Sequence, residues 1–406
     1  MAIVVLKFGG SSVATSGHIK RVAKRIVEYH SRGKQVVVVV SARGDTTDDL
    51  IASAKEVSTH LPSREMDMLL STGEQISIAL LTMAILELGC SALSFTGLQA
   101  GIITDSVHGK AKITDIKTDR LLNELNSGKI VVVAGFQGVS PQYEITTLGR
   151  GGSDTTAVAL AAALKAEVCE IFTDVDGVYT ADPRVVASAK KLKEISFEEM
   201  LELASLGAQV LQPRAVEFGM QYRVPIHVRS SFNYNEGTIV KEVEKMEQAL
   251  IVSGITYDYN TAKISLFDVP DRPGIAKTVF KALAQESINV DMIIQSTMRD
   301  ELNDISFTVT ENDLAKAVTI MERIKHEVNA TSISFDANVS KISIVGAGMI
   351  SNAGVAATMF EALADAGINI QMISTSEIKI SCIIGAWDTE KAVKVLHEKF
   401  NLQYVS

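Results

Sequence analysis

The chain has 406 residues, of which 47% are hydrophobic and 21% charged, so it is long enough for two or three globular domains and too apolar for extended disorder. Its 39 Lys and Arg residues against 48 Asp and Glu give a net charge of −9, which disfavours a nucleic-acid partner but leaves room for a local basic pocket. Three widely spaced cysteines, Cys90, Cys169 and Cys382, exclude a disulfide framework or zinc ribbon and fit a reducing compartment.

No membrane or targeting segment is expected. The chain opens with a strand-like run over residues 3–6, which is followed by Lys7 and two glycines and is the wrong shape for a signal peptide. The longest uncharged apolar stretch, about residues 76–86, is shorter than the roughly 20 residues that a membrane helix needs. We therefore expect a cytoplasmic protein that makes no contact with a membrane.

The first 230 or so residues alternate strand-length apolar runs with helical patterns. The continuous apolar runs, which are typical of parallel strands buried on both faces, are residues 3–6, 36–40, 130–134 and 168–173. The helical patterns cover residues 18–30, 74–88 and 154–164. This alternation predicts an α/β domain with a three-layer αβα sheet.

Further elements lead to a domain boundary. Ser196 and Glu199 form a capping-box pattern that predicts a helix before residues 200–206, and residues 224–228 form one more candidate strand. Turn-forming residues at 233–237 and a charged segment at 241–248 follow. We place the end of the first domain within about 232–255.

The remaining part contains an internal repeat. The segment Pro273-Gly274-Ile275-Ala276 returns as Ala353-Gly354-Val355-Ala356, and residues 280–284 and 288–293 return as 360–364 and 368–373. Each copy predicts strand, helix, strand, strand and helix, with the second helices at 313–328 and 389–400. A duplicated ferredoxin-like module with a purely structural role is one interpretation of this pattern.

Polar clusters follow the predicted strands of the first domain, where open α/β sheets bind their ligands. The first is Lys7-Phe8-Gly9-Gly10-Ser11-Ser12, whose glycines let the backbone approach a phosphate and whose lysine supplies a cation. It is not a Walker A loop, because the lysine precedes the glycines, and a structural turn remains an alternative. The second cluster, residues 41–48, is either an anion-holding loop or a helix cap by Asp45, Thr46 or Thr47.

Two more clusters complete the set. Residues 147–156 read Thr-Leu-Gly-Arg-Gly-Gly-Ser-Asp-Thr-Thr and open an alanine-rich helix, which predicts an anion cradle with Arg150 beside it. Residues 173–184 contain Asp-Val-Asp-Gly, but no glutamate follows at the spacing of a calcium loop. A loop shaped to a nucleotide base and ribose fits this segment better.

Several motifs are missing. The seven histidines are scattered without metal-ligand spacing, so no metal site is predicted, and neither Gly-x-Ser-x-Gly nor Gly-x-Gly-x-x-Gly follows the first strand. Phosphate cradles with cations and no evident general base suit phosphoryl transfer to an acceptor that is already anionic.

Together these clusters resemble the amino-acid kinase superfamily and, within it, the aspartokinases. The resemblance extends to residues 73–75 (Gly-Glu-Gln), 95–97 (Phe-Thr-Gly), 134–138 and 206–211, and the repeat resembles the tandem ACT domains of the monofunctional, lysine/threonine-regulated members. It implies a three-layer αβα kinase domain over residues 1–240 and two ferredoxin-like (βαββαβ) ACT domains over 255–337 and 338–406. The second ACT domain would exchange a strand with 249–257. No dehydrogenase domain follows, so the bifunctional aspartokinase–homoserine dehydrogenases fit less well.

The resemblance also implies roles for individual residues, with ATP and Mg²⁺ as cofactors. The catalytic set would be Lys7, Asp154, Gly10 and Gly152, with Asp154 orienting Lys7. L-Aspartate would bind at Thr47, Glu74, Arg150, Gly151 and Ser153, with Arg150 on a carboxylate and Glu74 on the amino group. The nucleotide would bind at Lys7, Phe8, Gly9, Gly10, Ser11, Thr173, Asp174, Tyr179, Asp182, Pro183, Arg184 and Gln209. Two positions depart from the family: Arg43 replaces the usual Met, and Gln209 the usual Lys.

The implied reaction is attack of the aspartate β-carboxylate on the γ-phosphate of MgATP, the first step of lysine, threonine and methionine biosynthesis. A carboxylate with a solution pKa of about 4 needs no general base. Lysine, threonine or both would inhibit by binding at Asp271, Gly274, Ile275, Ala276, Asn289, Val290, Asp291, Gln295, Thr297, Met349, Ser351 and Asn369. A homodimer or dimer of dimers through the ACT domains is expected. The alternatives are a glutamate, acetylglutamate or uridylate kinase, and an amino-acid sensor with an inactive kinase domain.

Overall fold

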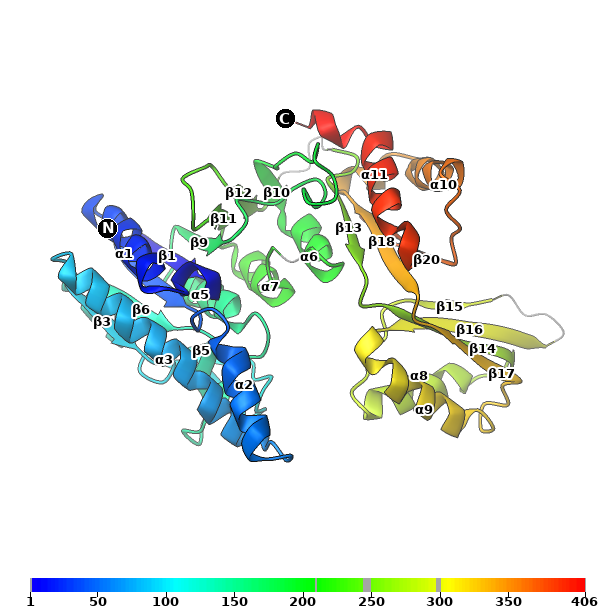
Figure 1. The fold of residues 1–406 in the computed structure, drawn as a ribbon, viewed down its shortest axis with the longest axis horizontal. Coiled ribbons are helices and arrows are strands. Elements are labelled where there is room, and N and C mark those ends of the chain that lie inside the picture. The colour runs from blue at the N-terminus through cyan, green and yellow to red at the C-terminus, as the bar shows by residue number, and fades with distance from the viewer. Residues whose placement is uncertain (1, 209, 244–249, 297–300, 406) are drawn as a thin grey trace.

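The computed structural model describes residues 2–208, 210–243, 250–296 and 301–405, which form three connected parts (Figure 1). A large α/β domain occupies the left of the view and ends near residue 241. The two sequence repeats form two smaller domains on the right. We call residues 262–336 the first repeat domain, and residues 339–405 with the strand 254–258 the second repeat domain.

An eight-stranded sheet forms the middle layer of the large domain, in the order β10-β12-β11-β9-β1-β2-β6-β3. Its strands are β1 (Ile3–Phe8), β2 (Gln35–Val40), β3 (Ala92–Phe95), β6 (Ile130–Ala134), β9 (Val168–Thr173), β10 (Glu194–Ser196), β11 (Ile226–Ser230) and β12 (Thr238–Lys241). From β11 to β3 all neighbours are parallel, and β12 runs antiparallel to β11. The predicted parallel sheet is therefore correct, and its Val-rich central strands are buried on both faces.

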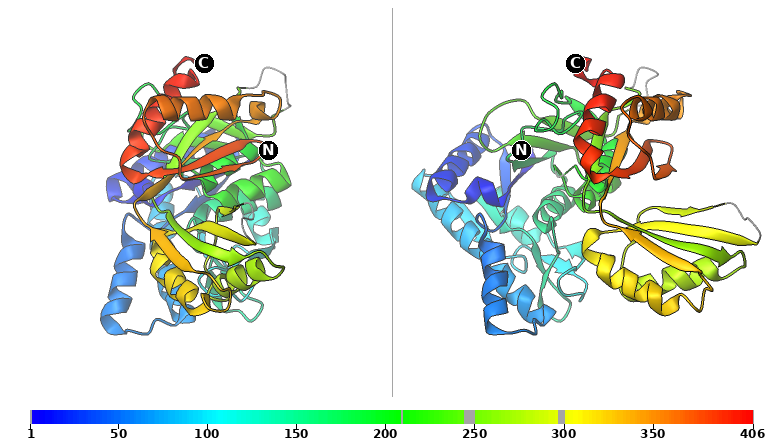
Figure 2. Two further views of the ribbon diagram at one scale, coloured as in Figure 1. Left: turned by 90° about the vertical axis from the view of Figure 1, so that its right-hand side faces the viewer. Right: turned by 45° about the vertical axis from the view of Figure 1, so that its right-hand side comes forward.

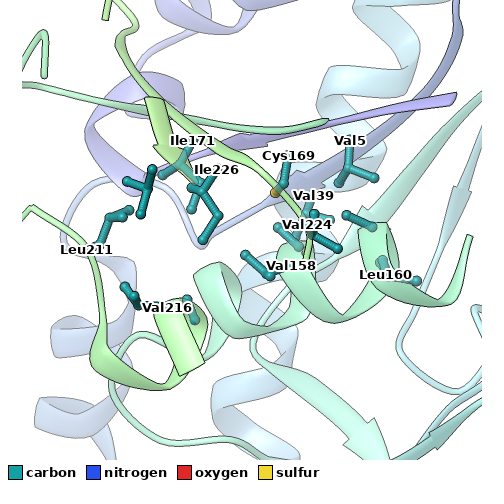
Figure 3. Close-up of a cluster of buried hydrophobic side chains, with 14 of the residues drawn as sticks. Val5, Val39, Val158, Leu160, Cys169, Ile171, Leu211, Val216, Val224 and Ile226 are labelled. Atoms are coloured by element: carbon teal, nitrogen blue, oxygen red, sulfur yellow. The ribbon is translucent and has the colours of Figure 1, made fainter. Parts of the chain in front are cut away.

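Helices cover both faces of this sheet, which confirms the three-layer architecture. One face carries α1 (Ser16–Ser31) and α3 (Ser63–Glu87), and the other carries α4 (Asp119–Asn126), α5 (Gly152–Ala163), α6 (Phe197–Ser205) and α7 (Pro213–Tyr222). Figure 3 shows Val158 and Leu160 of α5 packed with Val5, Val39 and Cys169 of the sheet. The helix α2 (Thr46–Val57) lies against α3. The predicted capping box is present at Ser196 and Glu199.

A second, four-stranded sheet lies beside the helix α5 in the order β5-β4-β7-β8. Its strands are β4 (Ile102–Thr104), β5 (Ile113–Ile116), β7 (Gln137–Val139) and β8 (Ile145–Thr147). The strand β8 leads through a short loop into α5, so this small sheet carries the glycine-rich segment at residues 149–152.

The helix α3 differs most from the prediction, because it begins at Ser63 rather than Glu74. Its amino-terminal half buries Asp67, Ser71 and Glu74 instead of apolar side chains, which conceals the helical period in the sequence. With 25 residues, α3 is also the one described helix that is long and apolar enough to cross a membrane, contrary to the expectation from residues 76–86. It packs along the sheet beside α1, as a core helix does.

The first repeat domain is a four-stranded antiparallel sheet in the order β15-β16-β14-β17, with two helices on one face. Its elements are β14 (Ala262–Pro270), α8 (Ile275–Gln285), β15 (Ile293–Gln295), β16 (Leu302–Val309), α9 (Leu314–Ile324) and β17 (Ser332–Asp336). Figure 2 shows this domain in yellow, projecting below the second repeat domain in its right-hand view.

The second repeat domain has the same strand order but takes one strand from elsewhere in the sequence. Its sheet, β13-β18-β20-β19, consists of β13 (Gly254–Asp258), β18 (Val339–Val345), β19 (Met372–Thr375) and β20 (Lys379–Gly385), covered by α10 (Val355–Asp365) and α11 (Thr389–Lys399). The strand β13 pairs antiparallel with β18, although the whole first repeat domain lies between them in the sequence. It occupies the edge position that β17 holds in the first repeat domain.

The two repeat domains meet through related polar pairs. Lys341 on β18 forms an ion pair with Asp291 of the first repeat domain, and Lys263 on β14 donates to the side chain of Gln371, the counterpart of Asp291 in the second. Met292, Val339, Met372 and Ile383 form a small apolar cluster between the repeats. The two copies of the sequence repeat thus contact each other in an approximately symmetric way.

The core between the sheet and α5 makes a testable prediction. Leu160→Ala, at a side chain with no exposed surface, should lower the free energy of unfolding by about 2–5 kcal/mol because it leaves a cavity. Leu86→Ala on α3, at a side chain 51% exposed, is the control and should change it by less than about 0.5 kcal/mol. Scanning calorimetry compares the two, and equal melting temperatures would contradict the assigned core.

Candidate active site

The centre of the candidate site is an ion pair between two distant segments. Lys7 lies near the end of β1, and Asp154 lies in the first turn of α5. The Lys7 Nζ is 2.5 Å from the Asp154 Oδ1, and both side chains are about nine-tenths buried. A carboxylate in the first turn also interacts favourably with the helix dipole. The structure therefore brings together the first and third of the predicted clusters.

The strand ends beside this pair approach each other closely because of Gly10. A Cβ on Gly10 would lie 2.8 Å from the carbonyl oxygen of Ala42, which follows β2, and the Gly44 N–H donates to the Gly10 carbonyl. The Gly9 N–H donates to the carbonyl of Phe172 on β9. The backbone after β1 is thus held between those after β2 and β9, and Phe8 stacks on Phe172 with ring centroids 4.7 Å apart.

The start of α5 has the form of an anion cradle. Gly151 has a φ of +70°, and a Cβ there would overlap the side chain of Gln212, so this position requires glycine. Ser153 packs against Gly135 after β6, where a Cβ would come within 2.7 Å of the serine hydroxyl. No side chain of the described residues caps the helix, but the Gly152 N–H donates to the Gly149 carbonyl and the Asp154 N–H to the Gly151 carbonyl. The helix dipole, rather than these two amides, would therefore favour an anion beside Lys7.

Glu74 supplies a buried carboxylate at the same edge of the sheet. It lies on α3, and its Oε1 accepts the backbone N–H of Ala42 at 3.0 Å. Its Oε2 is buried without a hydrogen-bond partner in the described part of the chain. Burial raises the pKa of Glu74 to about 8, against which the Ala42 hydrogen bond acts only in part. A buried carboxylate oxygen without a hydrogen-bond partner is suited to bind a cationic group of a ligand.

The loop that carries Arg150 is fixed by two residues that the sequence did not single out. Asp67, two turns before Glu74 on α3, accepts from the Gly109 backbone and from the hydroxyl of Thr147, and it pairs with His108. Arg214 donates to the carbonyls of Leu148 and Ala111. The guanidinium of Arg150 is exposed, and within the described ranges it forms no hydrogen bond or ion pair.

The second cluster combines a loop and a helix start. Asp45 occupies the N-cap position of α2 without capping it through its side chain, and the hydroxyl of Thr46 donates to the Arg43 carbonyl. Thr47 is half-buried in the first turn of α2. Arg43 donates to the carbonyls of Val13 and Ala14 and so supports the neighbouring loop.

Most of the predicted nucleotide-binding residues outside β1 lie along one continuous segment, mainly of bends and turns, that begins at the last residue of β9. We call this segment the nucleotide loop (residues 173–186). At its beginning the hydroxyl of Thr173 donates to Asp174, and farther on the hydroxyl of Tyr179 donates to Asp176 at 2.7 Å. Asp182 pairs with Arg184 at 2.8 Å, and this arginine holds the pKa of the carboxyl below its usual range. Pro183 is exposed between them. Gln209 lies outside the described residues.

A buried arginine that sequence reasoning missed braces this edge of the sheet. Arg25 on α1 donates to the carbonyls of Ser230 and Asn233, and its guanidinium lies over the rings of Phe172 and Tyr234. An arginine in the middle of an amphipathic helix carries no sequence signal for this role.

The predicted effector residues divide into three places. A cavity of about 330 Å³ in the first repeat domain is lined by Asp271, Gly274, Ile275, Ala276 and Gln295, and also by Asn303, which the sequence did not indicate. The Asn303 Oδ1 is buried and has no partner within the described ranges. Asn289, Val290 and Asp291 do not line this cavity; Asp291 pairs with Lys341. Met349, Ser351 and Asn369 belong to the second repeat domain, and Thr297 lies outside the described residues.

Comparison with known proteins defines first the class and then the family. A model of the amino acid kinase family matches residues 2–230, and an ACT domain model matches residues 268–323 and 342–400. The large domain is therefore a kinase domain, and the repeat domains are ACT domains. The chain is 53% identical to the aspartokinase of Bacillus sp. (strain MGA3) over 402 residues, which cover 99% of this chain and 98% of that protein. It belongs to the aspartokinase family.

Solved structures agree with this assignment. E. coli aspartokinase III in complex with aspartate and ADP, in its R-state, has 26% sequence identity and a TM-score of 0.83, with 98% of this chain and 99% of that chain covered. The same enzyme with lysine and aspartate, in its T-state, has 27% identity and a TM-score of 0.76 over the same shares. The predicted kinase fold with tandem ACT domains is thereby confirmed.

The raised pKa of Glu74 predicts a pH-dependent stability. Between pH 4.5 and about 8 the folded chain retains a proton that the unfolded chain has released, so this group lowers the free energy of unfolding as pH rises. Glu74→Gln removes this effect, and its melting temperature should rise relative to the wild type between pH 5 and pH 8. Glu87→Gln, at the exposed end of α3, is the control. A constant difference for Glu74→Gln across this range would contradict the raised pKa.

Proposed function

We propose that this chain is an aspartate kinase, which transfers the γ-phosphoryl group of ATP to the β-carboxylate of L-aspartate and gives 4-phospho-L-aspartate and ADP. The observation that carries the proposal is the buried Lys7–Asp154 pair, held at a helix start between the ends of parallel strands. Membership of the aspartokinase family supports the choice of acceptor.

The chemistry requires charge neutralisation more than proton transfer. The acceptor carboxylate is ionised at neutral pH and is repelled by the triphosphate, so a fixed cation between them lowers the barrier. Lys7 would supply this cation, and Asp154 would keep its ammonium group in place. Gly10 and Gly152 would bring the backbone close to the transferred phosphoryl group, since a side chain at Gly10 would collide with the Ala42 carbonyl and one at Gly152 with Leu148 and Phe136.

Aspartate would bind between α3 and the start of α5. The unpartnered Oε2 of Glu74 suits the substrate ammonium group, which would favour the ionised form of this glutamate and release its proton on binding. Arg150, which is free among the described residues, suits a carboxylate through its planar donor pair. Thr47, Gly151 and Ser153 would complete the acceptor site.

The nucleotide would lie across the ends of β1 and β9. Lys7, Phe8, Gly9, Gly10 and Ser11 would hold the phosphates, and the nucleotide loop with Gln209 would hold the base and ribose. No group of three or more His, Cys, Asp or Glu side chains that could hold a metal gathers in the described part of the chain. Mg²⁺ would be bound together with the triphosphate, because Mg²⁺ usually retains waters, takes few protein ligands and neutralises the charge of phosphate groups.

We also propose that lysine, threonine or both inhibit the enzyme, as befits the first step of the biosynthesis of lysine, threonine and methionine. The cavity of the first repeat domain is suited to an amino acid, because it is lined by the carboxylate of Asp271 and by Asn303, whose Oδ1 has no partner among the described residues. Inhibition requires that the effector bind an inactive arrangement more tightly than the active one. A homodimer or dimer of dimers through the ACT domains is the assembly we propose.

The role of Lys7 can be tested by Lys7→Ala. Loss of the cation should lower kcat by about a hundredfold or more, because its interaction is strongest as charge shifts in the transition state. Lys34→Ala is the matched control and should retain wild-type kcat, because Lys34 is a partly exposed lysine that pairs with Glu167 just before β2, at the amino-terminal end of the strands. Circular dichroism would verify folding, and a near-wild-type kcat in folded Lys7→Ala would refute this role.

The acceptor is identified by a hydroxylamine assay. The chain is incubated with MgATP, hydroxylamine and aspartate, glutamate, acetylglutamate or uridylate in turn, and acyl hydroxamate or ADP is measured. Hydroxamate with aspartate alone supports the proposal. Turnover of another acceptor would indicate a different amino-acid kinase, and no turnover with any acceptor would indicate an amino-acid sensor.

The effector site can be tested by Asn303→Leu. Replacement of the buried amide by an apolar side chain should raise the lysine or threonine concentration for half-inhibition about tenfold, since a site built around a hydrogen bond loses that bond. Activity without effector should be unchanged. Asn369→Leu, at an exposed asparagine of the second repeat domain, is the comparison. A larger effect of Asn369→Leu would move the site to the second repeat domain.

A further inference from the structure

The second part of the nucleotide loop is built into the regulatory half of the chain. Ala181 and Val186 are buried in the apolar core of the second repeat domain, together with Ile255 of β13 and Leu396 of α11. A loop of the kinase domain therefore shares a hydrophobic core with an ACT domain. Figure 1 shows β13 and α11 on the side of the second repeat domain that faces the kinase domain.

Two side-chain hydrogen bonds and one backbone hydrogen bond connect this loop to two elements of the second repeat domain. The hydroxyl of Tyr257, on β13, donates to the Asp182 Oδ2 at 3.1 Å. The hydroxyl of Thr180 is 3.0 Å from the Nε2 of His397 on α11, and both side chains are fully buried. The Ile255 N–H also donates to the Thr180 carbonyl.

The surroundings of Thr180 hold its hydroxyl group in place. Its oxygen also accepts the backbone N–H of Lys190 at 3.0 Å, so the hydroxyl group lies between Lys190 and the His397 Nε2. Burial lowers the pKa of His397, which favours the neutral ring. The neutral imidazole is therefore a fixed hydrogen-bond partner of the nucleotide loop.

We propose that Tyr257 and His397 are positioning residues of the nucleotide site, which hold Asp182 and Thr180 so that the loop is shaped for the nucleotide. This inference rests on the proposed assignment of the nucleotide loop. The inference extends that assignment, because side chains of the ACT domain would contribute to the affinity of the kinase domain for its nucleotide. A strand that completes the ACT sheet thereby acts on the site directly, through one hydroxyl group.

Glu199 of the kinase domain also contacts the second repeat domain, close to the start of β13. Glu199, at the start of α6, accepts the hydroxyl of Ser253 and the backbone N–H of Ala347. Ala347 opens the short helical segment Ala347–Ile350, which contains Met349. Movement of that segment would therefore be transmitted to the residues just before β13.

The test is Tyr257→Phe in the full chain, which removes a single oxygen atom. Loss of the bond should raise the dissociation constant for ADP and the KM for ATP about fivefold or more, with the KM for aspartate changed less than about twofold. Tyr259→Phe is the matched control, because Tyr259 packs edge-on against Tyr257 and its hydroxyl makes no hydrogen bond to the described residues. ADP binding is measured by titration calorimetry, and melting temperatures verify folding.

A double-mutant cycle tests the second bond. Thr180→Val and His397→Gln should each weaken ADP binding, and the double variant should be no weaker than the poorer single variant, because both remove one shared interaction. If the losses of ADP affinity in the two single variants add up fully in the double variant, the pairing of Thr180 with His397 is refuted.

The outcomes separate this inference from the proposed function. ADP affinity equal in Tyr257→Phe and Tyr259→Phe would refute the positioning role while aspartate kinase activity stands. A wild type that binds ADP but phosphorylates no aspartate would refute the acceptor and leave the ADP comparison decisive. A wild type that binds no ADP would refute both. Equal rises in the KM for ATP and for aspartate would indicate a general structural defect and overturn the inference.

Discussion

The structure of the candidate site depends on the ion pair between Lys7 and Asp154. A lysine buried at the end of a parallel strand must be paired, because an isolated ammonium group loses its hydration without compensation. The partner comes from the start of α5, so the pair fixes the position of that helix relative to β1. Every other feature of the site, from the glycine contacts at Gly10 to the cradle at Gly151 and Gly152, lies around this fixed point.

Around the ion pair, burial determines which side chains are charged and which are accessible. Glu74 retains its proton near neutral pH because it is buried with one oxygen unpartnered, whereas Arg150 remains solvent-exposed and available. Asp67 and Arg214 form hydrogen bonds to the loops around the site and so support these loops. In the proposed function, the groups that would bind substrate, Glu74 and Arg150, are thus distinct from Asp67 and Arg214, which support the loops.

The regulatory half is joined to the site by shared structure rather than by a linker alone. The strand β13 completes the sheet of the second repeat domain and at the same time bonds the nucleotide loop. A rearrangement of the ACT domains that shifts β13 must therefore act on Asp182. Two packings of such a shared element, each favoured by a different ligand, are sufficient for allosteric control.

The sequence by itself determined the three-layer domain, the repeat and the strand-end clusters, because Val-rich runs, glycine pairs and an offset repeat are local patterns. The contact between Lys7 and Asp154 and the exchange of a strand near residues 249–257 were expected only through the resemblance to a family, and the tertiary structure supplied their geometry: a buried ion pair, and β13 paired with β18. Tertiary structure alone decided that Asn303 rather than Asp291 lines the cavity. Asp67, Arg25 and His397 escaped prediction for one reason: a buried polar residue is explained only by partners that are distant in the chain, and its own neighbours in the sequence do not name them.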